Sequence, residues 1–158
     1  MDIFKILEEL GIKFEILEHD AVYTVEESRR LKIFEKLDGQ ACKNLFLKNK
    51  RGEYFLLVMP ADKRADLKSV AKVLSLPRLS FASEEDLEKI LGLYTGAVTP
   101  LGIINDVQKK IRLIIDAELK DKKLLLHPNR NTATISIAFE DLIKIILHTE
   151  HEYLTVNL

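Results

Sequence analysis

Three short segments of this sequence place polar residues where an apolar strand or a plain turn would be ordinary. In the first segment, Lys43 and Asn44 stand side by side at the start of the apolar run 45–47. A charge at such a position is costly unless it faces a cleft. Lys43 is therefore a candidate for holding a phosphate or the negative charge that develops on a reacting carbonyl. An edge-strand lysine that discourages pairing between sheets would produce the same pattern.

The second segment is the loop Gly96-Ala97-Val98-Thr99-Pro100. A glycine lets the backbone approach a ligand closely, and a proline four residues later stiffens the loop. Exposed backbone N–H groups in such a loop can bind a carbonyl or phosphate oxygen. An ordinary turn is the alternative interpretation.

The third segment, 126–134, reads Leu-His-Pro-Asn-Arg-Asn-Thr-Ala-Thr. Its polar and small hydroxyl side chains lie between two predicted strands. His127 and Asn131 are its candidate ligand-binding residues, although turn chemistry and capping explain the composition equally well.

Other catalytic signatures are missing from the sequence. It has no HExxH or CxxC spacing, no phosphate-binding loop and no GxSxG motif. His148 and His151 are spaced for a shared metal, but no residue nearby completes the site. Cys42 lies in an apolar strand and is interpreted as packing rather than as a nucleophile. We therefore expect neither a metal nor an organic cofactor.

Hydrophobic periodicity indicates the elements that must position these residues. Helices are predicted over 2–10, 24–36, 67–74, 83–92 and 139–147, the second opened by a Thr24–Glu27 capping box. Strands are predicted over 12–17, 42–48, 54–59, 79–81, 111–115, 123–126, 132–137 and 153–156. The mixture predicts an α/β fold of the α+β type, with one domain over 1–158 and a mixed central β-sheet flanked by helices.

Composition narrows the class of protein. The chain has 158 residues, enough for one compact domain, and a net charge of −1, whereas proteins that coat nucleic acid are strongly basic. Any contact with RNA should therefore be local, although the basic clusters 43–51 and 63–72 are equally compatible with solvated surface. The single cysteine and the lack of a signal peptide or an apolar span predict a cytoplasmic protein without membrane contact.

Taken together, the motifs resemble the YbaK/ProX family of prolyl-tRNA editing proteins over nearly the whole chain. They match most the free-standing ProX (PrdX-like) alanyl-tRNA(Pro) deacylases. The matching segments are, in order, 22–27, 43–47, 59–68, 79–82, 96–100, 105–106, 127–128 and 131–134. One departure is the segment 92–96, Gly-Leu-Tyr-Thr-Gly, where a proline before the loop glycine is expected.

The resemblance implies the editing-domain fold and hydrolysis in trans of the ester of alanine mis-attached to proline tRNA. It implies a catalytic set comprising Lys43, Gly96, Ala97 and Val98. It also implies a substrate-binding set comprising Tyr23, Asn44, Thr99, Pro100, His127 and Asn131. No metal or cofactor is implied. The implied partner is aminoacylated proline tRNA, with prolyl-tRNA synthetase as a second candidate.

Two alternatives stay open at this point. A deacylase for cysteine or serine on the same tRNA would have the same motifs. A non-catalytic tRNA- or protein-binding regulator could keep the fold and lose the chemistry. The intact lysine and the intact 96–100 loop favour an enzyme.

Overall fold

A run of apolar residues, Tyr54–Pro60, forms strand β3 in the middle of a mixed sheet in the computed structural model, which describes residues 2–158. The other strands are β1 (Glu15–Glu18), β2 (Gln40–Lys48), β4 (Ser80–Phe81), β5 (Ile111–Asp116), β6 (Lys123–Leu126), β7 (Ala133–Ala138) and β8 (Tyr153–Val156). Their order is β1-β7-β6-β2-β3-β5-β8, and β4 pairs with the outer end of β2. The pairs β2–β6, β3–β5 and β5–β8 are parallel and the remaining pairs are antiparallel.

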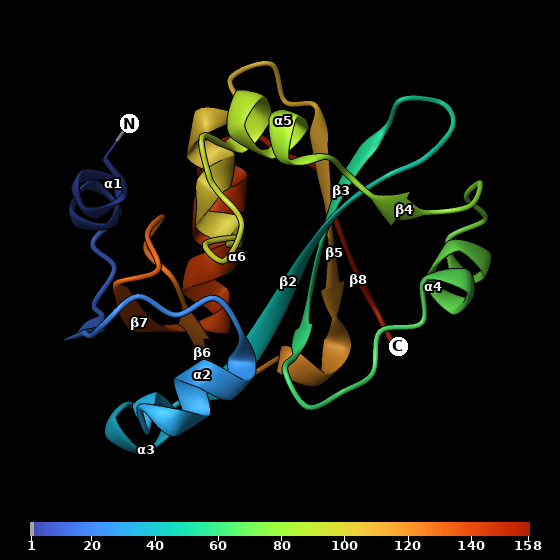
Figure 1. The fold of residues 1–158 in the computed structure, drawn as a ribbon. Coiled ribbons are helices and arrows are strands. Elements are labelled where there is room, and N and C mark those ends of the chain that lie inside the picture. Colours follow the sequence, from blue (N-terminus) through green and yellow to red (C-terminus); the bar gives the residue numbers. More distant parts are fainter. Residues whose placement is uncertain (1) are drawn as a thin grey trace.

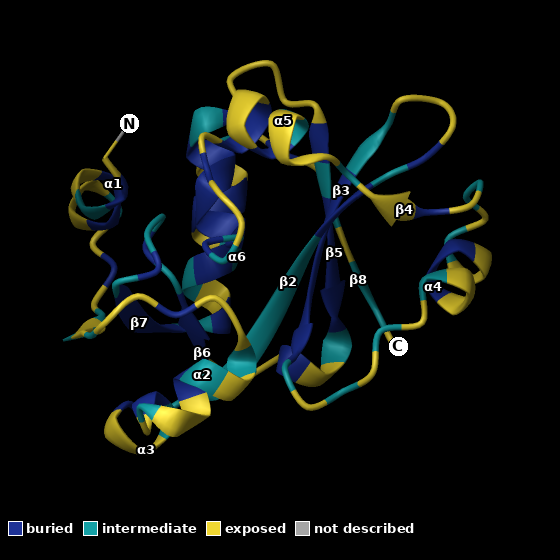
Figure 2. Ribbon diagram, viewed as in Figure 1, coloured by how far each residue is buried: buried dark blue, intermediate teal, exposed yellow. Residues whose placement is uncertain are grey.

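Both faces of the central strands are covered, which explains why β3 is apolar at every position. Leu56 and Val58 point into a large core, whereas Phe55 and Leu57 point into a smaller one on the opposite face. Figure 1 shows α4 on one side of the sheet and α6 on the other. Figure 2 shows the central strands buried between them and the outer turns of α3 and α4 exposed.

The helices are short and mostly cover the sheet. They are α1 (Ile3–Glu9), α2 (Val25–Arg30), α3 (Ile33–Lys36), α4 (Leu67–Val73), α5 (Glu84–Asp86) and α6 (Phe139–His148). A π-helical turn, Leu87–Leu91, extends α5, and two 3₁₀ turns occupy Pro100–Asn105 and Ala117–Leu119. Within residues 2–158, no helix has the length and apolar character needed to cross a membrane.

The predicted fold class, a mixed central sheet flanked by helices, is confirmed. The prediction of one helix over 24–36 is wrong. Lys32 adopts a left-handed φ of 57°, which ends α2 at Leu31 and starts α3 in a new direction. This break turns Ile33 into the core, where it is only 1% exposed. The first predicted strand is also shorter than expected, because only Glu15–Glu18 pair with β7.

A buried polar cluster fixes the 3₁₀ turn and the end of α6. Asp106 accepts hydrogen bonds from His151 Nε2 at 2.9 Å and from the backbone N–H groups of Ile111 and Lys110 at 2.9 and 3.1 Å. The carboxyl and imidazole side chains are 2% and 1% exposed. Burial alone would raise the pKa of Asp106, but the hydrogen bonds from His151 and the two amides outweigh it and lower this pKa. His151 is thus committed to Asp106, which is not the metal-sharing role with His148 that its spacing allowed.

Replacing Asp106 with asparagine is expected to lower the free energy of unfolding by about 3 kcal/mol at pH 7, because it leaves buried donors facing an amide. The folded-state pKa of Asp106 is lowered, so its contribution is present above the unfolded pKa and is lost as pH falls through the folded pKa. The difference in the free energy of unfolding between wild type and variant should therefore become smaller below about pH 4. Urea unfolding of both proteins at pH 7 and at pH 3 measures this difference at each pH. Asp38→Asn, at an exposed pair with Lys123, is the control and should change little at either pH.

Candidate active site

A cavity of about 210 Å³ opens beside the first half of β2. Strand β2 pairs with β6 only through Gln40 and Ala41, and with β4 only through Leu47 and Lys48. Between these two pairings, the edge of β2 lacks a neighbouring strand among residues 2–158. The residues that line the cavity come from this stretch of β2, from α2 and α3, from the end of β6 and from the loop before Pro100. Figure 1 shows α2 and α3 beside this end of β2.

The cavity brings together six of the ten residues predicted for the site, from four separate segments of the chain. They are Tyr23, Lys43, Asn44, Gly96, Val98 and His127. The remaining lining residues were not predicted as site residues; they are Thr24, Val25, Ser28, Phe34, Cys42, Leu125, Leu126 and Thr134. Half of them lie within the segments 22–27 and 126–134 that the motifs single out, whereas nothing in the types or spacing of the others marks them as a pocket wall.

The other four predicted residues do not line the cavity. Ala97, Thr99, Pro100 and Asn131 are all buried beneath it or beside it. Thr99 Oγ1 accepts the Leu101 N–H and so caps the 3₁₀ turn that Pro100 begins. These contacts support the loop, and the part of the four residues in binding or converting a substrate stays a prediction.

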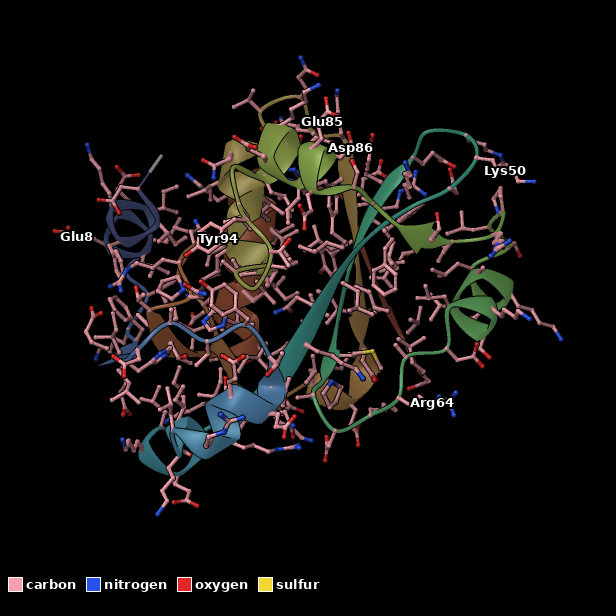
Figure 3. The ribbon with its side chains drawn as sticks, in the orientation of Figure 1. Glu8, Lys50, Arg64, Glu85, Asp86 and Tyr94 are labelled. Carbon is pink, nitrogen blue, oxygen red and sulfur yellow. The ribbon has the colours of Figure 1, made fainter. Side chains whose placement is uncertain are left out.

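Asn131 shows this supporting role in detail. Its carboxamide donates to the Val22 carbonyl at 2.9 Å and accepts from the Tyr94 hydroxyl at 2.9 Å. The Asn131 N–H in turn donates to the same hydroxyl at 3.2 Å. The three bonds join the segments before α2, after the π turn and before β7, with Tyr94 reaching in from the loop (Figure 3). Asn131 thus supports the walls of the cavity, and its part in binding a ligand stays a prediction.

Lys43 is partly buried and brings a positive charge to the cavity wall. No carboxylate of residues 2–158 lies within 4 Å of its ammonium group, unlike Lys63, which bonds Asp116 at 2.8 Å. A cation left without a partner at the edge of a cavity is available for an anionic or partly negative ligand atom.

Asn44 presents a buried acceptor that is not used within the protein. Its Nδ2 donates to the Val98 carbonyl at 3.3 Å, tying β2 to the loop. Its Oδ1 is buried and has no hydrogen-bond partner among residues 2–158. Buried polar atoms are normally paired, so this oxygen is suited to accept from an N–H or O–H group of a ligand.

His127 faces the cavity as a neutral imidazole. Its Nδ1 lies 2.9 Å from the Ala133 carbonyl, which can only accept, so Nδ1 carries the hydrogen and Nε2 is an acceptor. Burial lowers the pKa of His127, which favours this neutral form. Behind it, His19 packs with a ring-centroid distance of 6.2 Å and lies 2.8 Å from Thr134 Oγ1 through Nε2.

Neither a thiol nucleophile nor a metal centre emerges from the surroundings of the cavity. Burial raises the pKa of the Cys42 thiol to about 12, so it stays protonated near neutral pH. Within residues 2–158, no three His, Cys, Asp or Glu side chains are grouped to hold a metal ion. The chemistry available is therefore one lysine, amide and imidazole groups, hydroxyl groups, and the backbone of the loop and of β2. The hydroxyl groups belong to Tyr23, Thr24, Ser28 and Thr134.

Gly96 closes the cavity against the segment before α2. Its φ is +93°, and a Cβ built on it would lie 2.6 Å from Tyr23 Cδ1 and 3.2 Å from Tyr23 Cα. The glycine is thus required by the close approach of Tyr23 as well as by its backbone conformation.

Comparison with known proteins assigns this arrangement to a family. Residues 19–145 match the family model described as the aminoacyl-tRNA editing domain, and this span includes every residue that lines the cavity. The chain belongs to the aminoacyl-tRNA editing domain family. The family resemblance inferred from the motifs is confirmed.

Relatives of this editing domain match over almost their full length. The chain is 38% identical to the prolyl-tRNA editing protein ProX of Acetoanaerobium sticklandii over 154 residues, covering 96% of this chain and 93% of ProX. It is 34% identical to the prolyl-tRNA synthetase associated domain-containing protein 1 of Danio rerio, covering 96% and 85%. A solved structure described as a candidate trans-editing enzyme for prolyl tRNA synthetase has the same fold, with a TM-score of 0.70, 18% identity and coverage of 96% and 92%.

Proposed function

We propose that this protein is a free-standing aminoacyl-tRNA deacylase that removes alanine from mis-charged proline tRNA. The observation that carries the proposal is the cavity beside β2, which is lined by Lys43, whose ammonium has no ion pair, and by Asn44, whose buried oxygen has no hydrogen-bond partner among residues 2–158. Its similarity to ProX supports proline tRNA as the substrate. We also propose that it acts in the cytoplasm on aminoacylated proline tRNA, with prolyl-tRNA synthetase as a second candidate partner.

An aminoacyl ester is already activated, so its hydrolysis needs positioning and charge stabilisation more than a strong base. The oxygen of water attacks the ester carbonyl carbon, the bond to the ribose oxygen breaks, and that oxygen takes a proton. The products are free alanine and uncharged tRNA. Lys43 stabilises negative charge at the carbonyl or at the adjoining phosphate.

The neutral groups of the cavity orient the reactants. Asn44 Oδ1 accepts a hydrogen bond from the ammonium group of alanine, the ligand donor that fits an unpaired acceptor. His127 Nε2 accepts from the attacking water or from a ribose hydroxyl. A ribose hydroxyl that positions the water accounts for the absence of a charged protein base among the described lining residues.

Selectivity for alanine over proline follows from the size of the amino-acid side chain and from the number of hydrogens on its amine. A small cavity rejects a larger side chain by overlap, which discriminates more strongly than the loss of one favourable contact. Proline also has a secondary amine and so presents fewer donors to Asn44. A synthetase cannot fully exclude the smaller alanine, because the missing methylene groups reduce its binding by only about 1–3 kcal/mol. A second, small site of this kind removes the alanine that is attached by mistake.

The test is deacylation of proline tRNA charged separately with alanine, cysteine, serine and proline. Alanine should be released about tenfold or more faster than proline from the same tRNA. Fastest release of cysteine or serine would reassign the substrate. Equal rates for alanine and proline would remove the editing function, and tight tRNA binding with no hydrolysis of any ester would identify a regulator.

A further inference from the structure

A second hollow of about 830 Å³ lies on the α4 side of the sheet, away from the cavity. Its walls are the loop that enters α4, the exposed side of α4 and the segment 76–79 that leads to β4. Four of the residues that line it are basic, namely Arg64, Lys68, Lys72 and Arg78. We call these four residues and the space between them the basic groove.

The charge of the basic groove is not neutralised by the protein. All four cations are exposed, and none has a carboxylate of residues 2–158 within 4 Å. The one acidic lining residue, Asp66, caps α4 by accepting from the backbone N–H groups of Lys68 and Ser69 and from the Ser69 hydroxyl. Four cations and one carboxylate give the groove a net charge of +3 in a chain whose total is −1.

Some cations elsewhere on the surface are paired. Lys89 and Lys144, for example, form ion pairs with carboxylates one helical turn away. Figure 3 shows Lys50 and Arg64 extending on the α4 side of the molecule, whereas Glu85 and Asp86 lie on α5 at a distance from them. Within residues 2–158, the basic groove is thus one region where several exposed cations lie together without a carboxylate partner.

The groove is connected to the cavity by the β3–α4 loop. The Ala61 N–H donates to the Ala41 carbonyl at 2.8 Å, so this loop starts beside the strand that carries Lys43. Arg64 follows three residues later, a span of at most about 10 Å. Along β2, Lys43 belongs to the same alternate set as Leu45 and Leu47, which pack on the α4 side.

We propose that the basic groove binds the phosphate backbone of the tRNA acceptor arm while the terminal aminoacyl adenosine occupies the cavity. This inference rests on the proposed function. Lysine and arginine side chains that contact phosphates orient a nucleic acid without reading its sequence. Each contact releases bound counterions, so binding weakens as salt rises. The groove gives a nearly neutral protein a local surface for RNA, and its position fixes the direction from which the acceptor arm approaches.

The experiment compares two substrates with the double variant Lys68→Gln/Lys72→Gln. The variant should lower kcat/KM for alanyl-tRNA by about fivefold or more, and the dependence on salt should become shallower by roughly one or two phosphate contacts. Hydrolysis of alanyl-adenosine, which has no acceptor arm, should be unchanged. The matched control Lys89→Gln/Lys144→Gln removes two surface cations elsewhere and should leave both rates unchanged.

An unchanged rate on alanyl-tRNA would overturn the proposal, as would an equal loss on both substrates, which would indicate damage to the cavity. Binding of uncharged proline tRNA, measured by fluorescence anisotropy, tests the groove independently of catalysis. If the wild type cleaves no ester, the proposed function fails. The groove then stands if the double variant loses tRNA affinity, and falls if the affinity is unchanged.

Discussion

Replacing Lys43 with alanine is expected to lower kcat/KM for alanyl-tRNA hydrolysis by more than about a hundredfold, while the melting temperature stays close to that of wild type. The ammonium group has no ion pair to lose among residues 2–158, so the folded state should not depend on it. A contact to charge that develops in the transition state is worth about 3 kcal/mol, and each 1.36 kcal/mol changes the rate tenfold. Single-turnover rates and thermal melts of the same sample measure both effects.

The control is Lys48→Ala, because Lys48 lies on the same strand but beside β4 rather than at the cavity. It should keep near wild-type activity. Lys43→Arg separates charge from shape, since a planar guanidinium keeps the charge but is not interchangeable with a compact ammonium. An activity of Lys43→Ala within about threefold of wild type would show that the lysine has no part in the chemistry.

The strands were predictable because their side chains must alternate or be buried on both faces. The apolar run of β3 and the alternation of β7 left few other interpretations. The break at Lys32 was not predictable from the capping box and periodicity, because it depends on where the core can accept Ile33. Helical propensity is a weak preference that such tertiary packing overrides.

The candidate site was predictable only as a set of motifs. The sequence pointed to Lys43, Asn44 and the 96–100 loop, and the structure places the lysine and the amide at the open edge of β2. It did not indicate that Asn131 has its carboxamide bonded to Val22 and Tyr94, because those partners lie 109 and 37 residues away along the chain. A motif shows which residue types occur together, whereas their separation into lining and supporting residues depends on long-range contacts.

The contact between Gly96 and Tyr23 is the most constrained of these long-range contacts. The sequence suggested that the glycine lets substrate approach the loop. The structure adds that the glycine lets the loop approach Tyr23, whose neighbour Thr24 caps α2 and also lines the cavity. A side chain at position 96 would therefore push on the segment that holds the opposite wall.

Gly96→Ala is expected to reduce both turnover and stability. A left-handed φ of +93° costs an alanine about 1 kcal/mol, and the added Cβ would lie 2.6 Å from Tyr23 Cδ1, so the segment before α2 must move. We expect kcat/KM to fall about thirtyfold, equivalent to about 2 kcal/mol of transition-state stabilisation. The free energy of unfolding should fall by about 2–3 kcal/mol, in the range of an overpacked site. Deacylation assays well below the melting temperature separate the two effects.

Gly52→Ala is the matched control, because Gly52 has a φ of +76° and a Cβ there would have nothing within 4 Å. It carries the same backbone cost without the clash, in the hairpin between β2 and β3. We expect a stability loss of about 1 kcal/mol and full activity. If Gly96→Ala behaved like Gly52→Ala in both measurements, the glycine would serve only its own backbone conformation. The packing of Tyr23 against the loop would then have no part in shaping the cavity.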